Sequence, residues 1–147
     1  MRSEQTSLRG ALSKMSEYTK PLPKPTETSR PFWEAAKRHQ LQLQQCGGCK
    51  AFIYYPRDRC PHCLSEQLDW KPVSGKGKVY SYTVVRRAAT RSFSDRPYVL
   101  AIVELDEGPR MTTNVEAAPE SIKIGMPVTA FFDDVTPEKT LVKFKPA

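Results

Sequence analysis

The sequence predicts a mainly β protein in three parts: a short N-terminal helix, a zinc ribbon and a small closed β-barrel. Two observations support this. All four cysteines stand in two Cys-x-x-Cys pairs, Cys46/Cys49 and Cys60/Cys63. From residue 74 onward, β-branched and aromatic runs alternate with turn residues, without a helical period. We therefore assign 1–29 to a flexible N-terminal segment, 30–73 to the helix and ribbon, and 74–147 to the barrel.

Charge and composition narrow the classes of function. Lys plus Arg number 23 against 16 for Asp plus Glu, a formal net charge of +7. This excess favours an anionic partner, such as a phosphorylated cofactor or nucleic acid, or it serves solubility alone. No apolar run reaches the length of a membrane span, and the N-terminus lacks the apolar centre of a signal peptide. Reduced, metal-bound cysteines then fit a cytoplasmic protein.

The N-terminal segment is polar and carries Pro21, Pro23 and Pro25, so it cannot bury much surface. We expect it to be mobile or extended. Translation can start at Met1 or at Met15, because the sequence after Met15 reads as naturally as the longer form.

A helix is predicted to begin after Ser29, because Pro31 suits a first helical turn and good helix formers follow it. Phe32 lies on one face of this helix with the alanines that follow. Phe32 and Trp33 are too apolar to stay in water. They either pack on the ribbon or dock to another subunit, because aromatic residues anchor interfaces.

The cysteine spacing predicts a structural zinc site with Cys46, Cys49, Cys60 and Cys63 as ligands. A two-residue gap lets one tight turn direct two sulfurs to a common point. We expect positive φ angles at Gly47–Gly48, and Pro61 stiffens the second turn. Four thiolates leave no position for water or substrate, which argues against hydrolysis. The alternatives are a pair of disulfides or an iron centre.

Three short strands are predicted around these turns, at Leu41–Gln45, Phe52–Pro56 and Leu68–Val73. Such a core is too small to fold alone, so the metal must supply much of its folding free energy.

The barrel is predicted from five β segments separated by turn residues, a number that matches an OB-fold. The segments are Lys78–Val85, Tyr98–Leu105, Arg110–Val115, Pro127–Asp133 and Thr140–Lys145.

Together these motifs resemble one known family. A Pro-Phe-Trp helix start at 31–33 precedes the two Cys-x-x-Cys pairs. The runs GKVYSYTVV at 77–85 and PYVLAIVELDEGPRM at 97–111 then follow in order. Over residues 31–145 the chain is similar to the acyl-CoA-associated zinc-ribbon/OB-fold family, domain of unknown function 35. The resemblance implies a small auxiliary subunit of thiolase-like, acyltransferase or aldolase enzymes that act on CoA thioesters, with the catalytic residues on the partner.

Catalysis by the isolated chain is not expected. A thiolase needs a nucleophilic cysteine, and every cysteine here is assigned to metal. His39 and His62 stand beside the ribbon, and we expect His62 to be exposed. The acidic pair Asp133–Asp134 closes a strand before a turn, where we expect it in solvent.

The loop after the first barrel strand is the candidate ligand site. It carries the candidate CoA-binding residues Arg86, Arg87, Arg91, Phe93 and Arg96. Arginine binds phosphate bidentately, and an aromatic ring stacks on adenine. The same residues suit single-stranded nucleic acid, protein docking, or a solvated loop.

Two hypotheses therefore remain: an auxiliary subunit of a CoA-thioester enzyme, and a single-stranded nucleic-acid-binding module. The second would need exposed aromatic rings on one barrel face. Tyr80 and Tyr82 share a face by alternation, although their stretch also suits a barrel core.

Overall fold

The computed structural model describes residues 18–147. The possible start at Met15 and most of the N-terminal segment lie outside this range. The described elements are, in chain order, α2 Arg30–Lys37, β1 Gln42–Cys46, β2 Phe52–Ile53, β3 Leu68–Pro72, β4 Lys76–Val85, the 3-10 helix η1 Arg91–Phe93, β5 Tyr98–Leu105, β6 Arg110–Val115, β7 Pro127–Asp134 and β8 Thr140–Pro146. None of the described helices is long and apolar enough to cross a membrane.

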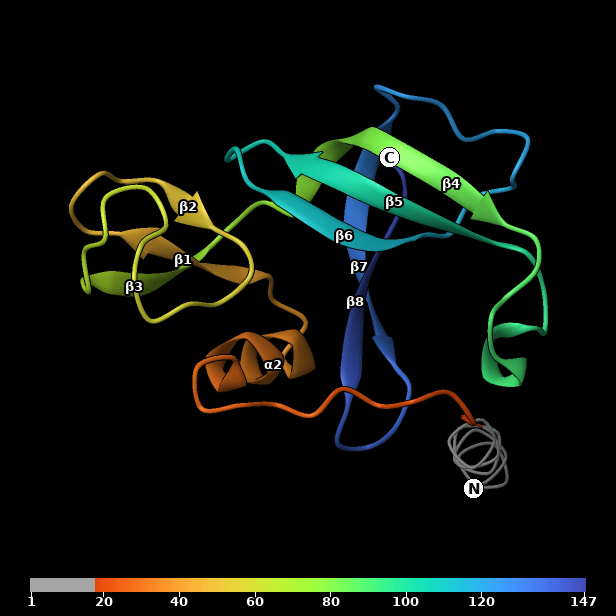
Figure 1. The fold of residues 1–147 in the computed structure, drawn as a ribbon, viewed down its shortest axis with the longest axis horizontal. Helices are drawn as coiled ribbons and strands as arrows, with labels where there is room; N and C mark the ends of the chain where they lie inside the picture. Colours follow the sequence, from red (N-terminus) through yellow and green to blue (C-terminus); the bar gives the residue numbers. More distant parts are fainter. Residues whose placement is uncertain (1–17) are drawn as a thin grey trace, which may run out of the picture.

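The strands form two separate sheets (Figure 1). The ribbon is a three-stranded antiparallel sheet in the order β2-β1-β3. The barrel closes in the order β4-β5-β6-β8-β7, with β6 and β8 parallel and its other pairs antiparallel. The predicted mainly β class, the helix, the ribbon and the five-stranded OB-fold barrel are confirmed.

The barrel core follows the two-residue period of its strands. In β5, Val99, Ala101, Val103 and Leu105 are buried and alternate with partly or fully exposed residues. Alternation of this kind buries one side chain in every two on the barrel interior. Phe144 of β8 is fully buried at the centre.

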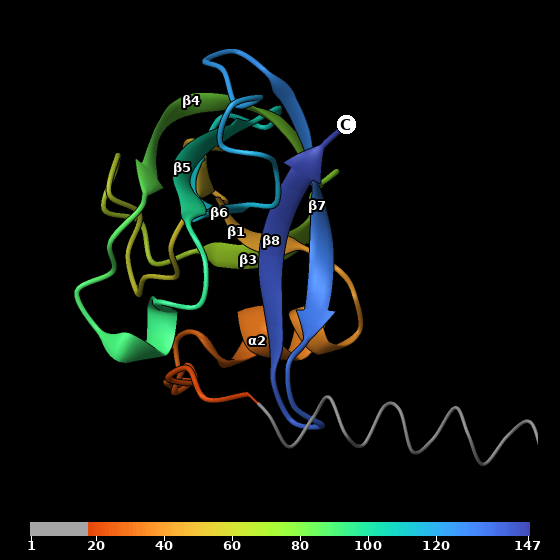
Figure 2. The ribbon, with the colours of Figure 1, turned by 90° about the vertical axis from the view of Figure 1, so that its right-hand side faces the viewer.

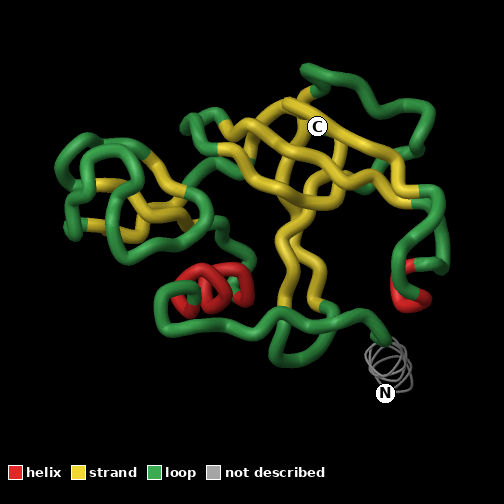
Figure 3. Tube along the Cα trace, in the orientation of Figure 1, coloured by secondary structure: helices red, strands yellow, loops and turns green. Residues whose placement is uncertain are grey.

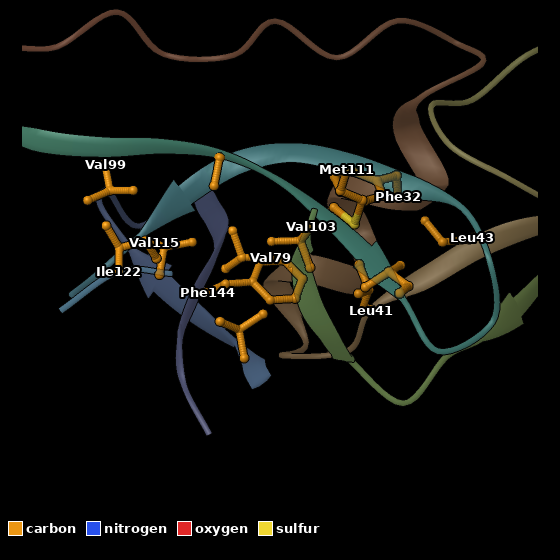
Figure 4. Close-up of a cluster of buried hydrophobic side chains, with 13 residues drawn as sticks. Phe32, Leu41, Leu43, Val79, Val99, Val103, Met111, Val115, Ile122 and Phe144 are labelled. Atoms are coloured by element: carbon orange, nitrogen blue, oxygen red, sulfur yellow. The ribbon is translucent and has the colours of Figure 1, made fainter. Parts of the chain in front are cut away.

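The helix and the first ribbon strand join this same core (Figure 4). Phe32 of α2, with Leu41 and Leu43, packs in one buried cluster with barrel residues such as Val103 and Met111. Figure 2 shows α2 beside the β7–β8 hairpin, and α2 contacts both strands as well as β1. The sheets therefore separate near residue 74, but the apolar core runs across that point.

The first barrel strand contains an irregularity that sequence alternation did not predict. Val79 pairs with Val103, whereas Ser81 already pairs with Ile102, so Tyr80 is an extra residue in β4. A bulge of this kind shifts the alternation of faces. Tyr82 consequently lies opposite the buried Ala101. Tyr80 and Tyr82 are 46% and 38% exposed, but the bulge prevents them from sharing one face by alternation.

Gly77 permits the close approach of β4 and β5 just before this bulge. A Cβ atom on Gly77 would lie 2.5 Å from the carbonyl oxygen of Glu104. Real Cβ atoms do not approach a backbone oxygen so closely. Gly77 and Glu104 belong to paired strands, so neither backbone can move away easily. The position requires glycine for lack of space.

Candidate functional site

The four cysteine sulfurs converge at one end of the ribbon. All four Sγ atoms lie within 4.8 Å of one another. The Sγ atoms of Cys46 and Cys63 are 3.5 Å apart, and those of Cys49 and Cys60 are 3.6 Å apart. Cys46 and Cys60 are buried, while Cys49 and Cys63 are exposed. The predicted ligand set is therefore brought together in space.

Both cysteine turns use the same backbone hydrogen bonds. The N–H of Lys50 donates to the carbonyl of Cys46, and the N–H of Leu64 donates to that of Cys60, at 3.0 and 2.9 Å. In return, Cys46 and Cys60 each donate their own N–H to the residue five positions later, Ala51 or Ser65, at 2.9 Å. Each turn thus fixes its two sulfurs by the same geometry, as two-fold related halves of a four-thiolate site require.

The expected positive φ angles occur at other positions than predicted. They fall on Lys50 (φ 64°) and Leu64 (φ 65°), which directly follow the second cysteine of each turn. Gly47 and Gly48 are not in this conformation. A Cβ on Gly47 would lie 3.2 Å from Cβ of Gln67, so tight contact with the loop residue just before β3 explains a small residue there.

The sulfur positions fit a tetrahedral metal ion. Zinc bound to four thiolates at about 2.3 Å places the sulfurs about 3.8 Å apart, close to the two separations above. A hydrogen bond from the backbone N–H of Cys49 lowers the pKa of the Cys46 thiol to about 6. At Cys49, the hydrogen bond from the backbone N–H of Ala51 is outweighed by burial and the neighbouring thiols, which raise the pKa of this thiol to about 11. A thiol that ionises readily is a good metal ligand, because metal binds the thiolate. Zinc held here would join β1 to the loop before β3, with no chemical step of its own.

The candidate CoA loop lies between β4 and β5, at the end of the barrel away from the ribbon (Figures 1 and 3). Arg86, Arg87 and Arg91 are exposed. None of the three side chains makes an ion pair or hydrogen bond with another residue of 18–147. These arginines therefore present free guanidinium groups to solvent.

The two other predicted loop residues are already engaged. Nη2 of Arg96 lies 3.3 Å from Oε2 of Glu116. The Phe93 ring lies 6.3 Å from the Tyr98 ring, centroid to centroid, and Nζ of Lys20 lies 5.7 Å from its centroid. Phe93 is partly buried, so it offers less of a stacking face than its sequence position suggested.

A hollow of about 530 Å³ runs between this loop and the N-terminal segment. Its lining includes two cationic residues, several hydroxyl groups and one carboxylate: Tyr18, Thr19, Lys20, Arg91, Ser92, Ser94 and Asp95. Nζ of Lys20 lies 3.5 Å from Oδ2 of Asp95, whereas Arg91 has no ion-pair partner among residues 18–147. Sequence reasoning missed Lys20, because it lies far from the loop in the chain.

The two predicted docking residues differ in their surroundings. Phe32 is only 6% exposed and packs inside the chain, so packing accounts for it without a partner. Trp33 is half-buried and lines a shallow groove of about 200 Å³ between α2 and the β7–β8 turn. Trp33 stays a docking candidate.

The acidic pair lies at the surface, with Asp134 exposed and Asp133 partly exposed, but both carboxylates have partners. Oδ2 of Asp133 accepts a hydrogen bond from Nζ of Lys143 at 2.7 Å. Asp134 accepts one from the hydroxyl of Thr140 and contacts His39. The hydroxyl of Thr140, followed by His39, lowers the pKa of Asp134. His62, in contrast, is exposed as predicted.

On the outer face of the barrel, Tyr80 is covered by Arg110. The guanidinium carbon lies 3.7 Å from the Tyr80 ring centroid, and Nε of Arg110 is 3.1 Å from Oε2 of Glu104. One face of the ring is thus taken by a cation. This outer face offers little of the aromatic platform that the nucleic-acid hypothesis requires.

Comparison with known proteins agrees with the two-part architecture. Residues 33–69 match a family model described as "ChsH2, rubredoxin-like zinc ribbon domain", and residues 70–133 match "ChsH2, C-terminal OB-fold domain". A solved structure titled "Ltp2-ChsH2(DUF35) aldolase" is similar over 84% of this chain and 98% of that one, with 41% identity and a TM-score of 0.76.

Three curated relatives are also similar. A "DUF35 domain-containing scaffold protein" of Methanothermobacter thermautotrophicus is 39% identical over 77% of this chain and 86% of its own length. A "Probable enoyl-CoA hydratase alpha subunit" of Thermomonospora curvata is 46% identical over 79% of this chain, which spans 37% of that relative. "Benzoylsuccinyl-CoA thiolase subunit BbsA" of Thauera aromatica is 27% identical over 56% of each chain.

Proposed function

Because the chain belongs to the DUF35 family of zinc-ribbon and OB-fold proteins, we propose that it is the non-catalytic zinc-containing subunit of a thiolase-like complex that acts on CoA thioesters. The names of similar proteins support this assignment, because they include a scaffold protein, a thiolase subunit and an aldolase complex. The partner would supply the catalytic residues.

The observation that carries the proposal is the commitment of all four cysteines to one cluster. A thiolase acylates a cysteine thiolate, and a thiolate in a metal tetrahedron is not free to attack. The exposed surface of the described residues carries free cations at Arg86, Arg87 and Arg91. Such a surface can bind and orient an anionic substrate, but it provides no nucleophile.

We assign one structural zinc ion to Cys46, Cys49, Cys60 and Cys63. Its role is to hold β1, β2 and β3 together. The apolar cluster that belongs to the ribbon alone consists of little more than Ile53, Leu68 and the two buried cysteines. Thiols kept reduced on a metal are compatible with the cytoplasm.

We assign the phosphates of the CoA thioester to Arg86, Arg87 and Arg91, at a site shared with the partner. Coenzyme A carries three phosphate groups, and guanidinium binds phosphate in bidentate fashion. These three arginines are free, whereas Arg96 is paired. Binding by charge helps substrate and transition state equally, so it acts on affinity.

Co-purification tests the assembly. The tagged chain is expressed with a thiolase-like catalytic subunit, and acyl-CoA turnover is measured for the chain alone, the partner alone and the complex. We expect a stable complex, about one zinc per chain, and turnover only where the partner is present. Turnover by the pure chain would refute a non-catalytic role. Failure to bind any such partner, with tight binding to single strands, would favour the nucleic-acid alternative.

A further inference from the structure

His39 ends helix α2 in a backbone conformation that usually selects glycine. Its φ is 59°. The N–H of His39 donates to the carbonyl of Ala36, and the N–H of Gln40 donates to that of Ala35, both at 2.9 Å. This is the hydrogen-bond pattern of a Schellman cap, in which the left-handed position is normally glycine. A histidine there is strained, so contacts of its side chain must offset the strain.

The imidazole reaches across to the barrel. It stacks on Phe132 of β7, with ring centroids 5.4 Å apart and planes 8° apart. Its Nε2 lies 2.8 Å from Oδ2 of Asp134, also on β7. Asp134 in turn accepts a hydrogen bond from Thr140 of β8. The His39 side chain therefore ties the end of α2 to β7, and Asp134 links this contact to β8 through Thr140.

His39 lies in the short link between helix α2 and the ribbon. Helix α2 ends at Lys37, two residues before His39, and β1, the central ribbon strand, begins at Gln42. Hydrogen bonds also hold the linker between ribbon and barrel: the N–H of Ser74 donates to Oε1 of Glu107 at 2.7 Å, and the N–H of Ala130 donates to the carbonyl of Gly75 at 2.8 Å. The ribbon is thus held at two separated points, besides the shared apolar core.

Several charged residues surround the His39 imidazole, but one carboxylate lies close to it. The charged residues on the elements packed against the end of α2 are Lys37 and Arg38 of the helix end, Asp133 and Asp134 of β7, Glu138 and Lys139 of the turn, and Lys143 and Lys145 of β8. Asp133 is engaged by Lys143. Among residues 18–147, Asp134 supplies the opposite charge that lies within ion-pair distance of His39.

We propose that His39 and Asp134 form a proton-dependent clasp that sets how firmly the helix and ribbon are held against the β7–β8 hairpin. The imidazolium makes a charge-assisted bond to the carboxylate, while the neutral ring keeps the stack and a weaker bond. Histidine is the side chain whose charge changes between about pH 5 and pH 8. Protonation of the imidazole therefore tightens the clasp, and it does so whether or not the chain assembles with a partner.

Amide hydrogen exchange on the zinc-loaded chain tests the clasp. His39→Asn keeps a residue that tolerates the left-handed conformation, but it removes the stack and the ion pair. We expect a roughly two- to fivefold loss of protection in the β7–β8 turn and at the end of α2 near pH 6, in line with a half-exposed ion pair. The loss should be smaller near pH 8.

His62→Asn is the matched control, because His62 is exposed and should leave both regions unchanged. Equal protection in wild type and His39→Asn at both pH values would overturn the clasp. A loss of the same size at both pH values would overturn its proton dependence. Asp134→Asn should reproduce the His39→Asn pattern, and its failure to do so would remove Asp134 from the clasp.

Discussion

The ribbon and the barrel are both small antiparallel β structures, but different forces stabilise them. The barrel closes on itself around a continuous core that contains Val103, Met111 and Phe144. The ribbon has three short strands, of which one has two residues, and its own core is built around Cys46, Cys60 and Ile53. What the ribbon lacks in apolar burial it must obtain from metal and from the core it shares with the barrel. The two regions should therefore respond very differently to loss of metal.

Loss of a metal ligand should have the largest effect. Structural zinc contributes about 10–16 kcal/mol of apparent binding free energy in isolated zinc-finger peptides near neutral pH. Cys60→Ser should therefore unfold β1–β3. Because Leu43 then leaves the shared core, the barrel should keep its fold in an amide NMR spectrum but unfold at a lower denaturant concentration. His62→Asn, in the same turn, is the control and should keep the zinc. If Cys60→Ser removed all β structure, the barrel could not be considered independent of the metal.

The second-largest effect should come from shortening a side chain in the apolar core that the ribbon and the barrel share. Leu43 belongs to the ribbon strand β1 but is 1% exposed in the barrel-side cluster. Leu43→Ala should destabilise the zinc-loaded protein by about 2–5 kcal/mol in denaturant unfolding. Because the core is common, ribbon and barrel signals should shift together. A ribbon that melts separately, with an unchanged barrel midpoint, would contradict a shared core.

Adding one methyl group to a crowded barrel position should have a smaller effect. Gly77→Ala places a Cβ atom against the Glu104 carbonyl, and forcing such a contact typically costs about 1–3 kcal/mol. Gly48→Ala is the matched control, since its Cβ would meet Cys46 and Cys63 Sγ at an ordinary 3.6 Å. Thermal unfolding should rank Gly77→Ala clearly below Gly48→Ala and wild type. The reverse order would mean that β4 and β5 separate easily.

The smallest expected effect is a pH-dependent change in the stability contributed by Asp134. The pKa of Asp134 is lowered, first by Thr140 and then by His39. A carboxyl whose folded pKa is depressed stabilises the fold above its unfolded pKa of about 3.9, and this contribution is lost as pH falls through the folded value. Asp134→Asn should thus be less stable than wild type at pH 5–6 by under about 1 kcal/mol, given its exposure. The difference should vanish towards about pH 2.

Sequence reasoning succeeded where the relevant contacts are local. The cysteine turns, the bounds of β5 and β6, and the five-strand count follow from short-range spacing and alternation. It failed where a contact joins distant residues. His39 and Asp134 are 95 positions apart, so no pattern in either stretch indicates their bond. The bulge at Tyr80 was missed for a related reason, because register depends on the partner strand.

The candidate site divides in the same way. Spacing alone predicted that the four cysteines gather in one cluster, whereas composition alone could not separate free from paired arginines. Nothing in the sequence around Arg96 distinguishes it from Arg86, yet Arg96 forms an ion pair with Glu116, which directly follows β6. Likewise, Phe32 and Trp33 are neighbours of similar apolarity, and only the fold shows which one is buried.

Kinetics of the reconstituted complex test most directly whether the chain contributes charge to CoA binding without taking part in the chemistry. Arg86→Ala, Arg87→Ala and Arg91→Ala are compared with Arg96→Ala, the already paired control. A lost charge-assisted bond of about 1–3 kcal/mol corresponds to a roughly five- to 150-fold rise in KM, with little change in kcat. We expect this from at least one free arginine, and a smaller defect with a pantetheine thioester that lacks the nucleotide. An unchanged KM in all three variants, or a loss confined to kcat, would contradict the account.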